Sequence, residues 1–508
     1  MDKKRDLDNY NMLFALSKEI QTLKGAGALL YWDQDTYMPS GAIAARAEQI
    51  ALLDTLGHKK LTNKVYGNSL KKLIHLETGK ILATTLSAEK KAAVKEWYRT
   101  YTRLICLPNA FVEEFAILTS HAKHEWIAAR QENNFLKFTP FLERIIEMCR
   151  KKAEFLTYKQ HPYDALLNEY EPYWTTHQVE QLFSELKPSV LKFLKFIAAE
   201  PEINDGYLFG SFAKNKQLDF SHLMLKKMDY DLNCGRLDLS AHPFTTSFHP
   251  TDVRLTTAVH PSSLMSSIWA TIHEGGHGLY EQGLPKELFG SPLCEAISLG
   301  VHESQSRLWE TQLGQSLPFW RYFFPLLKKE FPNALGKVSL KQFYAAINKV
   351  EPGSIRIEAD EVTYNLHIII RFEIEKALIE GTLAVKDLPE VWNSKMKQYL
   401  NVTVKNNTEG CLQDIHWSMG AFGYFPTYTL GNLYAAQLFA TLKKQYPSWK
   451  KGVEQGDLIF IKQWLSKNIY QYGKRYSSRA LIKKITGEQL TANYFIKYLH
   501  NKYQEIYA

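Results

Sequence analysis

Apolar residues spaced three and four positions apart along most of this 508-residue chain constrain its fold more than any other feature. This spacing follows the turn of an α-helix and gives each helix one apolar face. The pattern predicts long amphipathic helices over residues 7–30, 43–56, 88–106, 109–131, 138–157, 177–199, 322–350, 365–380 and 480–505. We therefore expect a mainly α fold.

One region departs from the helical pattern. Residues 244–248 and 252–259 alternate and are rich in β-branched side chains, which predicts two short strands. An extended edge here would allow a peptide to add as a further strand, whereas a structural hairpin explains the pattern about equally well. Histidine density favours the first interpretation, because six of the sixteen histidines lie within residues 242–302, in and around these strands: His242, His249, His260, His273, His277 and His302.

Length and composition describe a globular protein. With 45% hydrophobic residues, the chain can bury a large core, and its length favours two to four domains unless it forms one large helical body. We find no low-complexity linker that would mark a domain boundary. Five scattered cysteines without a C-x-x-C pair argue against a disulfide framework and a cysteine zinc site.

Targeting signals are not evident. No apolar run approaches the length of a membrane span, and the charged start of the chain lacks the apolar stretch of a secretory signal. We expect a cytoplasmic protein that does not enter a membrane.

The formal net charge of +9 is concentrated at one end of the chain. Residues 441–508 hold 13 Lys or Arg against 4 Asp or Glu, and the remainder balances at 49 against 49. No recognised nucleic-acid module accompanies this segment, so we expect no nucleic-acid partner. A solvated helical face is the favoured interpretation, and docking of an acidic partner is the alternative.

Residues His273, Glu274, Gly275, Gly276 and His277 spell H-E-x-x-H. Side chains four apart lie on one face of a helix, so two neutral imidazoles can bind one zinc ion while the glutamate faces its bound water. Glu274 is then the general base. The paired glycines cost the helix about 1 kcal/mol each and leave room for a substrate or another helix, although simple packing explains them nearly as well.

A third ligand is expected from the next predicted helix, which runs through Leu293, Ile297, Val301 and Leu308 and presents Glu295, Glu303 and Glu310. Glu303 is our choice because Arg307 lies one turn on and can orient its carboxylate, while Ser304 and Gln305 supply donors. Glu295 is second. His302 points roughly a hundred degrees away and is interpreted as a supporting or core histidine.

Five motifs in order now resemble a known family: D-x-R-x-T at 252–256, H-E-x-G-H at 273–277, H-E-S-Q at 302–305, I-R-x-x-A-D at 355–360 and G-x-x-Q-D-x-H-W at 410–417. The opening Y-W-D-Q-D at 31–35, followed by Met38-Pro39, is similar as well. Together they resemble the thermostable carboxypeptidase Taq family of metallocarboxypeptidases, peptidase family M32.

The resemblance implies a large helical body with a deep active-site groove, similar to angiotensin-converting enzyme and neurolysin, with a small β-sheet near the metal. It implies one metallopeptidase domain over residues 1–508, with two lobes around the groove, and a homodimer that removes single C-terminal residues from peptides. Matched residue by residue, His273, His277 and Glu303 hold the metal and Glu274 is the base. We expect Zn²⁺, with Co²⁺ as an alternative.

A carboxypeptidase must also bind a free carboxylate, which a guanidinium does through paired hydrogen bonds. Arg356 is the first candidate and Arg254 the second; a salt bridge from Arg356 to Glu358 or Asp360 is the structural alternative. For the oxyanion of the scissile bond we expect a donor near residues 416–428, with Tyr424 first. His416 is the other candidate there, either as a donor or as a reader of the substrate carboxylate.

Three functions remain open on the sequence. The first is a zinc carboxypeptidase. The second is an oligopeptidase that cuts internal bonds of short peptides with the same chemistry. The third is a helical binding protein with a structural metal, against which the intact Glu274 argues, since a structural site tends to close its fourth coordination position.

Overall fold

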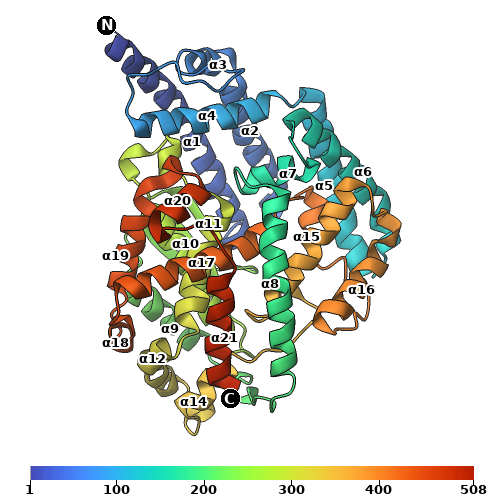
Figure 1. Cartoon of the computed structure of the whole chain (residues 1–508), viewed down its shortest axis with the longest axis vertical. Coiled ribbons are helices and arrows are strands. Elements are labelled where there is room, and N and C mark those ends of the chain that lie inside the picture. Colours follow the sequence, from blue (N-terminus) through green and yellow to red (C-terminus); the bar gives the residue numbers. More distant parts are fainter. Residues whose placement is uncertain (1, 508) are drawn as a thin grey trace.

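The computed structural model describes residues 2–507 as a mainly helical protein with one small sheet (Figure 1). Its α-helices are α1 (Asp2–Thr36), α2 (Ile43–Thr62), α3 (Lys64–Lys71), α4 (Ala88–Ile105), α5 (Asn109–Gln131), α6 (Phe135–Leu156), α7 (Pro162–Tyr170), α8 (Thr176–Ile197), α9 (Lys214–Lys227), α10 (Ser266–Gln282), α11 (Leu299–Arg307), α12 (Leu317–Glu330), α13 (Pro332–Leu335), α14 (Leu340–Ala346), α15 (Tyr364–Glu380), α16 (Leu388–Leu400), α17 (Pro426–Gln445), α18 (Trp449–Glu454), α19 (Ile459–Asn468), α20 (Ser478–Thr486) and α21 (Asn493–Tyr507). The mainly α fold class is therefore confirmed.

Two predicted helices are broken in the structure. The segment 322–350 falls into the end of α12, α13 and α14, because Pro332 cannot continue a helix and instead begins the next one. The segment 480–505 divides into α20 and α21 at Gly487, whose φ of +88° ends α20. The other seven predicted segments each correspond to one helix.

The sheet has the order β1-β3-β2, formed by β1 (Gly235–Leu239), β2 (Thr245–His249) and β3 (Asp252–Thr257). β1 runs parallel to β3, and β2 runs antiparallel to it. The two predicted strands are β2 and β3, and β1 was missed although residues 236–239 alternate between polar and apolar side chains. Leu255 of β3 packs on α10 near Gly278, so the sheet lies directly against that helix.

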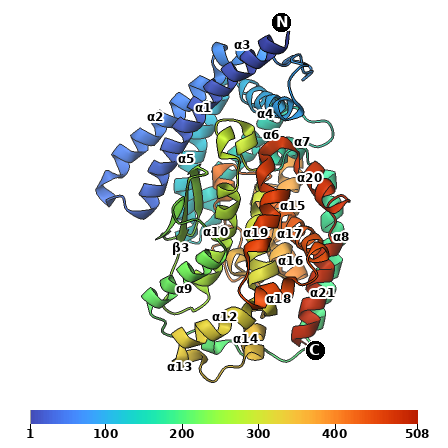
Figure 2. The same cartoon turned by 90° about the vertical axis from the view of Figure 1, so that its left-hand side faces the viewer.

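The end of α1 packs against the face of the sheet that is turned away from α10 (Figure 2). Arg254 lies 4.3 Å from the centroid of the Trp32 ring and 5.0 Å from that of Phe248, in cation–π geometry. Tyr37 donates a hydrogen bond to Asp238 of β1. These contacts fix the N-terminal helix to the sheet.

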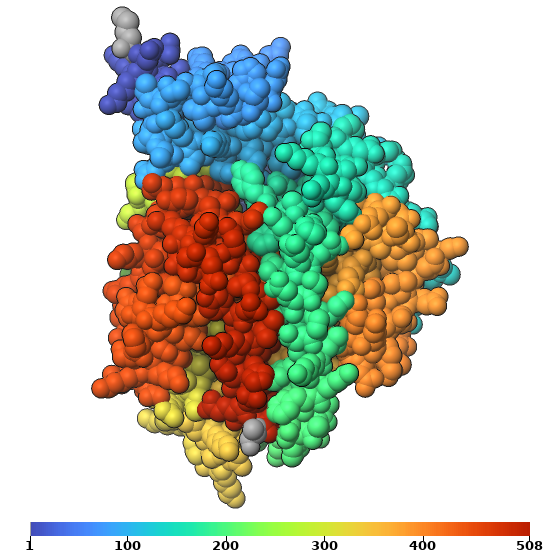
Figure 3. Space-filling view, viewed as in Figure 1, coloured from blue at the N-terminus to red at the C-terminus, as the bar shows by residue number. Residues whose placement is uncertain are grey.

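Buried apolar residues form two clusters. The smaller combines side chains from α1 to α4 with Leu293, and the larger spans the chain from α5 onward. In space-filling view the N-terminal helices cover one end of the body (Figure 3). α8 and α21, far apart in sequence, lie side by side. No helix within residues 2–507 is long and apolar enough to cross a membrane.

Basic residues of the 441–508 segment are paired with acidic residues elsewhere in the fold. Lys462 contacts Asp229 at 2.7 Å, Lys474 contacts Glu295 at 2.5 Å, and Lys502 forms a buried ion pair with Glu361. Part of the local charge excess is therefore used to tie the C-terminal helices to the body.

Glu171, which follows α7, is a buried carboxyl group that contacts the start of α11. It accepts hydrogen bonds from the Ser298 hydroxyl and the Gly300 backbone N–H, each at 2.9 Å, and from the Tyr434 hydroxyl at 3.4 Å. Burial raises its pKa to about 7, because a charged carboxylate is poorly solvated there, and these donors oppose the rise. Glu171 thereby anchors the helix that carries Glu303.

Replacing Glu171 with Gln tests this cost of burial. A carboxyl group whose pKa is higher in the folded than in the unfolded state favours folding below its unfolded pKa of about 4.5, and the advantage is lost as pH rises through about 7. Relative to E171Q, the wild type should lose up to about 3 kcal/mol of unfolding free energy between pH 4.5 and 8. Thermal melts of the metal-free proteins measure this difference, and a gap independent of pH would contradict it.

Candidate metal centre

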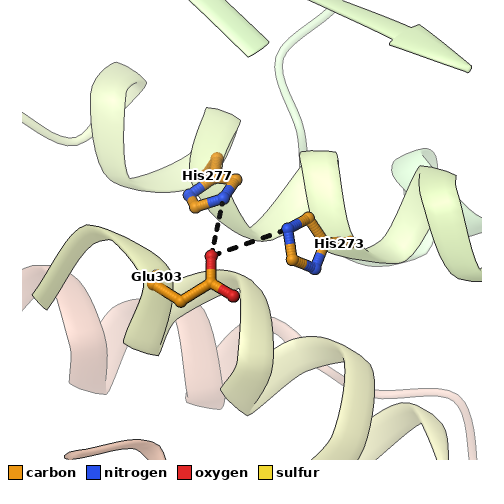
Figure 4. Close-up of side chains that lie close together, drawn as sticks. All are labelled: His273, His277 and Glu303. Atoms are coloured by element: carbon orange, nitrogen blue, oxygen red, sulfur yellow. Dashed lines mark ion pairs between the residues drawn. The ribbon is translucent and has the colours of Figure 1, made fainter. Parts of the chain in front are cut away.

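Helix α10 presents both imidazoles of the H-E-x-x-H motif on one side (Figure 4). The ring centroids of His273 and His277 lie 4.9 Å apart, as expected for residues one helical turn apart. Both side chains are half-buried.

Glu303 reaches this pair from α11. Its Oε2 atom lies 3.7 Å from Nε2 of His273 and 3.5 Å from Nε2 of His277, and the ligand atoms of all three residues lie within 4.8 Å of one another. Tetrahedral ligands about 2.1 Å from a zinc ion lie about 3.4 Å apart, so the spacing and the donor set fit such an ion. Of the three acidic candidates, the structure brings Glu303 to the metal-facing nitrogens.

Two glycines allow this close approach. A Cβ atom on Gly276 would lie 2.7 Å from the Gln305 carbonyl oxygen and from Ser306 Cα, so its absence lets the α11 backbone contact α10. A Cβ atom on Gly431 of α17 would lie 2.6 Å from Cγ of Glu303. Room for another helix therefore explains Gly276.

The electrostatics also favour a cation. Burial lowers the pKa of His273, but Glu303 and Glu310 outweigh it and raise that pKa to about 9. Burial raises the pKa of Glu303, but the two histidines and Arg307 bring it down to about 2. The surroundings of His273 therefore favour positive charge, which a divalent cation bound at this cluster would supply.

The other two acidic candidates have different partners. Glu295 precedes α11 in an extended segment, because Ser298 caps that helix and it begins only at Leu299; its carboxylate binds Gln21 and Lys474. Glu310 lies on a π-helical turn, Leu308–Gly314, and contacts the Nδ1 atom of His273 at 2.7 Å.

The groups expected to orient Glu303 differ in part from those found. Arg307 donates to Glu310 at 2.9 Å and acts on Glu303 through its charge alone. Gln305 donates to the Ser304 hydroxyl rather than to the ligand. Ser306, which sequence reasoning did not select, donates to Oε2 of Glu303 at 3.2 Å.

Glu274 lies beside the ligands and is 7% exposed. Thr245 of β2 donates to its Oε2 atom at 2.6 Å. Burial raises the pKa of Glu274, which makes its carboxylate a better proton acceptor. The contact of Thr245 joins the edge strand to this carboxylate, and no sequence motif singled Thr245 out.

His302 stacks on His277, a candidate metal ligand. Its ring lies 4.3 Å from the ring of His277 with an interplanar angle of 15°, and its Nε2 atom lies 3.0 Å from Glu281. This position matches the supporting role that its direction on the helix predicted.

Arg356 lies in a buried cluster with an excess of positive charge. Its guanidinium contacts Asp414 Oδ1 at 2.7 Å and donates to the Tyr364 hydroxyl at 3.0 Å. Arg371 binds the other oxygen of Asp414 at 2.6 Å, so two guanidiniums share one carboxylate. Neither of the two predicted structural partners, Glu358 and Asp360, forms an ion pair with Arg356.

Tyrosines lie between this cluster and the metal ligands. Tyr364 contacts Arg356 and is close enough to Glu303 for the carboxylate charge to raise its pKa, in addition to the effect of burial. Tyr424 is half-buried, and its pKa is raised by burial and by Glu303. The ring of His416 lies 5.1 Å from that of Tyr424, and its Nε2 atom lies 3.3 Å from the Tyr428 hydroxyl.

Arg254, the second candidate for the substrate carboxylate, is engaged elsewhere. It binds Asp252 through two contacts, at 2.9 and 3.0 Å, and stacks on Trp32. The structure therefore places Arg254 against α1 and does not bring it to Arg356 or Tyr424.

Separate substitutions of Gly275 and Gly276 test whether the missing side chain at Gly276 is what allows α11 to pack closely on α10. In G276A the new methyl group meets backbone atoms of α11 at 2.7 Å, so Glu303 should shift and zinc affinity should fall by about tenfold or more. In G275A it meets only side-chain ends of Leu225 and Met228 at 2.9 Å, so affinity should change little. Competition with a chromophoric chelator measures both, and equal effects would refute the explanation.

Comparison with known proteins agrees with this geometry. A model of the carboxypeptidase Taq (M32) metallopeptidase family matches residues 12–503. Thermostable carboxypeptidase 1 of Thermus thermophilus is 40% identical over an alignment of 510 residues. The alignment covers 98% of this chain and 99% of that protein. Carboxypeptidase 1 of Bacillus subtilis is 39% identical over 495 residues, 97% of this chain and 98% of that protein.

A solved structure extends the likeness to three dimensions. The M32 carboxypeptidase from Deinococcus radiodurans superposes with a TM-score of 0.94 at 35% identity, over 98% of this chain and 99% of that chain. The family predicted from five ordered motifs is confirmed: the chain belongs to the carboxypeptidase Taq (M32) family of metallopeptidases.

Proposed function

We propose that this chain is a zinc-dependent carboxypeptidase that uses Glu274 as general base and Arg356 as the anchor for the substrate carboxylate. Family membership makes it a metal-dependent carboxypeptidase. The convergence of His273, His277 and Glu303 within 4.8 Å is the observation that supports the zinc site. The same membership argues against a binding protein with a merely structural metal.

His273, His277 and Glu303 would hold a divalent metal ion, which would supply Lewis acidity to lower the pKa of a water molecule and polarise the scissile carbonyl. The Glu274 carboxylate is the group placed to accept a proton from an attacking water molecule and to deliver it to the departing amine. Thr245 holds the carboxylate of Glu274 in place through its 2.6 Å hydrogen bond. The half-buried ligands leave solvent a path to the site.

Substrate binding is proposed to use the two features on either side of the metal. β2 is an edge strand of the sheet, so an extended peptide can pair along it. Arg356 then binds the terminal carboxylate: with Arg371 sharing Asp414, one positive charge is left for an incoming anion. This charge balance favours a substrate with a free C-terminus over an internal segment.

Tyr424 is proposed to donate a hydrogen bond to the oxyanion that forms at the scissile carbonyl. Its position beside Glu303 and His416 supports this role. Burial lowers the pKa of His416 to about 4, so its imidazole is neutral near pH 7 and acts as a hydrogen-bonding group rather than a cation. His416 is the second candidate for the oxyanion and an alternative contact for the substrate carboxylate.

Four further expectations stay predictions: the two-lobed single domain over residues 1–508, the homodimer, the cytoplasmic location and the absence of a nucleic-acid partner. Zinc as the native metal, with cobalt as an alternative, also stays a prediction.

The substitution E274Q separates catalysis from metal binding. Gln cannot accept the proton, so kcat should fall by about 10²–10⁴-fold, while the three ligands are untouched and zinc affinity should not weaken. Turnover assays and chelator competition on the same preparation measure both quantities. Wild-type turnover in E274Q would exclude Glu274 as the base.

Blocked and free peptides distinguish the carboxypeptidase from an oligopeptidase. Mass spectrometry of free-acid peptides should show stepwise shortening from the C-terminus that disappears with chelator. The same peptides with amidated C-termini should survive, because Arg356 then lacks its anionic partner. Efficient internal cleavage of the amides would instead support an oligopeptidase.

Conservative exchange of each candidate arginine identifies the carboxylate anchor. R356K keeps one charge but loses the paired hydrogen bonds, so kcat/KM on free-acid peptides should fall by about 30-fold or more, equivalent to about 2 kcal/mol. R254K is the matched control and should leave kcat/KM near the wild-type value, since Arg254 is held by Asp252 and Trp32. The reverse pattern would assign the anchor to Arg254.

A further inference from the structure

The two imidazoles of the metal centre are supported in different ways. Nδ1 of His273 lies 2.7 Å from Oε2 of Glu310. Nδ1 of His277 is buried and, within residues 2–507, has no hydrogen-bond partner. Its ring is instead held by the parallel ring of His302. Only one of the two ligands therefore has a carboxylate behind it.

We propose that Glu310 is a positioning residue that fixes the ring of His273 and strengthens its bond to the metal ion. A carboxylate on the far nitrogen of a ligating imidazole sets its tautomer, orients its ring and makes it more basic. With Nδ1 donating to Glu310, the lone pair of Nε2 faces His277 and Glu303. This inference rests on the metal site proposed above.

Glu310 is itself held firmly. Nη1 of Arg307 donates to the same Oε2 atom at 2.9 Å, and Nε of Arg307 donates to Asn432 at 2.7 Å. Asn432 in turn donates to Asn365 of α15 at 3.0 Å. A chain of hydrogen bonds through α11, α17 and α15 thus orients the carboxylate, and Arg307 offsets the cost of burying its charge.

The local backbone places the two glutamates on opposite sides of one ring. α11 continues directly into the π-helical turn Leu308–Gly314, which contacts α10. Glu303, before this turn, lies 3.7 Å from Nε2 of His273, and Glu310, within it, lies 2.7 Å from Nδ1. Single π-helical turns recur at functional sites, which agrees with a role for this one.

Zinc affinity tests the proposal without reference to catalysis. E310Q keeps the size of the side chain and removes its charge, so the zinc Kd, measured by competition with a chromophoric chelator, should rise by about 10- to 100-fold. E310D keeps the charge on a shorter side chain and should fall between E310Q and the wild type. The absorption spectrum of bound Co²⁺ should change in E310Q as the His273 ring reorients.

E375Q is the matched control. Glu375 is also a buried carboxyl group, and it accepts hydrogen bonds from Tyr163 at 2.6 Å, Trp417 at 2.9 Å and Gly423 at 3.0 Å, with no contact to a metal ligand. Removing its charge should leave zinc affinity unchanged. Thermal melts of each metal-free variant establish that it is folded.

Three results would overturn the proposal: a wild-type zinc Kd in E310Q, an equal loss in E375Q, or an equal loss in E310D and E310Q. Failure of the proposed function would look different. If Glu274 is not the base, E274Q keeps its turnover while E310Q still binds zinc weakly. If the wild type itself binds no zinc, the metal site and the role of Glu310 fall together.

Discussion

The packing of α11 against α10 is the contact on which the site depends. At Gly276 the two backbones meet without an intervening side chain, and this brings the Glu303 carboxylate to within 3.7 Å of the Nε2 atoms of His273 and His277. Placing a carboxylate there costs desolvation energy, which the two imidazoles and Arg307 offset. Other features maintain the same approach: Gly431 leaves room for the ligand from α17, and Glu171 holds the first turn of α11.

Charge is divided between two ends of the site. Three glutamates, Glu274, Glu303 and Glu310, surround the two imidazoles at the metal end, whereas Arg356 and Arg371 outnumber Asp414 at the other end. A cation suits the first environment and a carboxylate the second. Tyrosine side chains lie between them, with hydroxyl groups that stay neutral because burial raises their pKa. If the substrate binds as proposed, it would be met by a fixed electrostatic pattern rather than by a single charged residue.

The local sequence pattern was sufficient to predict most helices and to place the two imidazoles on one side of a helix. Both features depend only on residues three and four positions apart. It failed where a distant contact decides the outcome. Glu295 has the spacing of a ligand, but the helix capped by Ser298 begins only at Leu299, four residues after Glu295, and leaves Glu295 to bind Lys474. Thr245 carries no motif, and only the fold of β2 against α10 brings its hydroxyl to Glu274. Arg307 lies one helical turn after Glu303, as the sequence indicated, but the prediction that it orients the Glu303 carboxylate was wrong. The π-helical turn places Glu310 within its reach, and Arg307 donates to Glu310 instead.

The two motif arginines show why residue type alone does not assign a role. Each has the guanidinium that a carboxylate anchor needs, and each binds an aspartate. Arg254 has Asp252 to itself and lies between two aromatic rings, so its charge is balanced and its surfaces are covered. Arg356 shares Asp414 with Arg371, so two guanidiniums are ion-paired with one carboxylate. Because leaving a buried charge unpaired is costly, the second environment gains more from a bound anion than the first. The difference lies in the count of charges around each guanidinium, which only the folded chain defines.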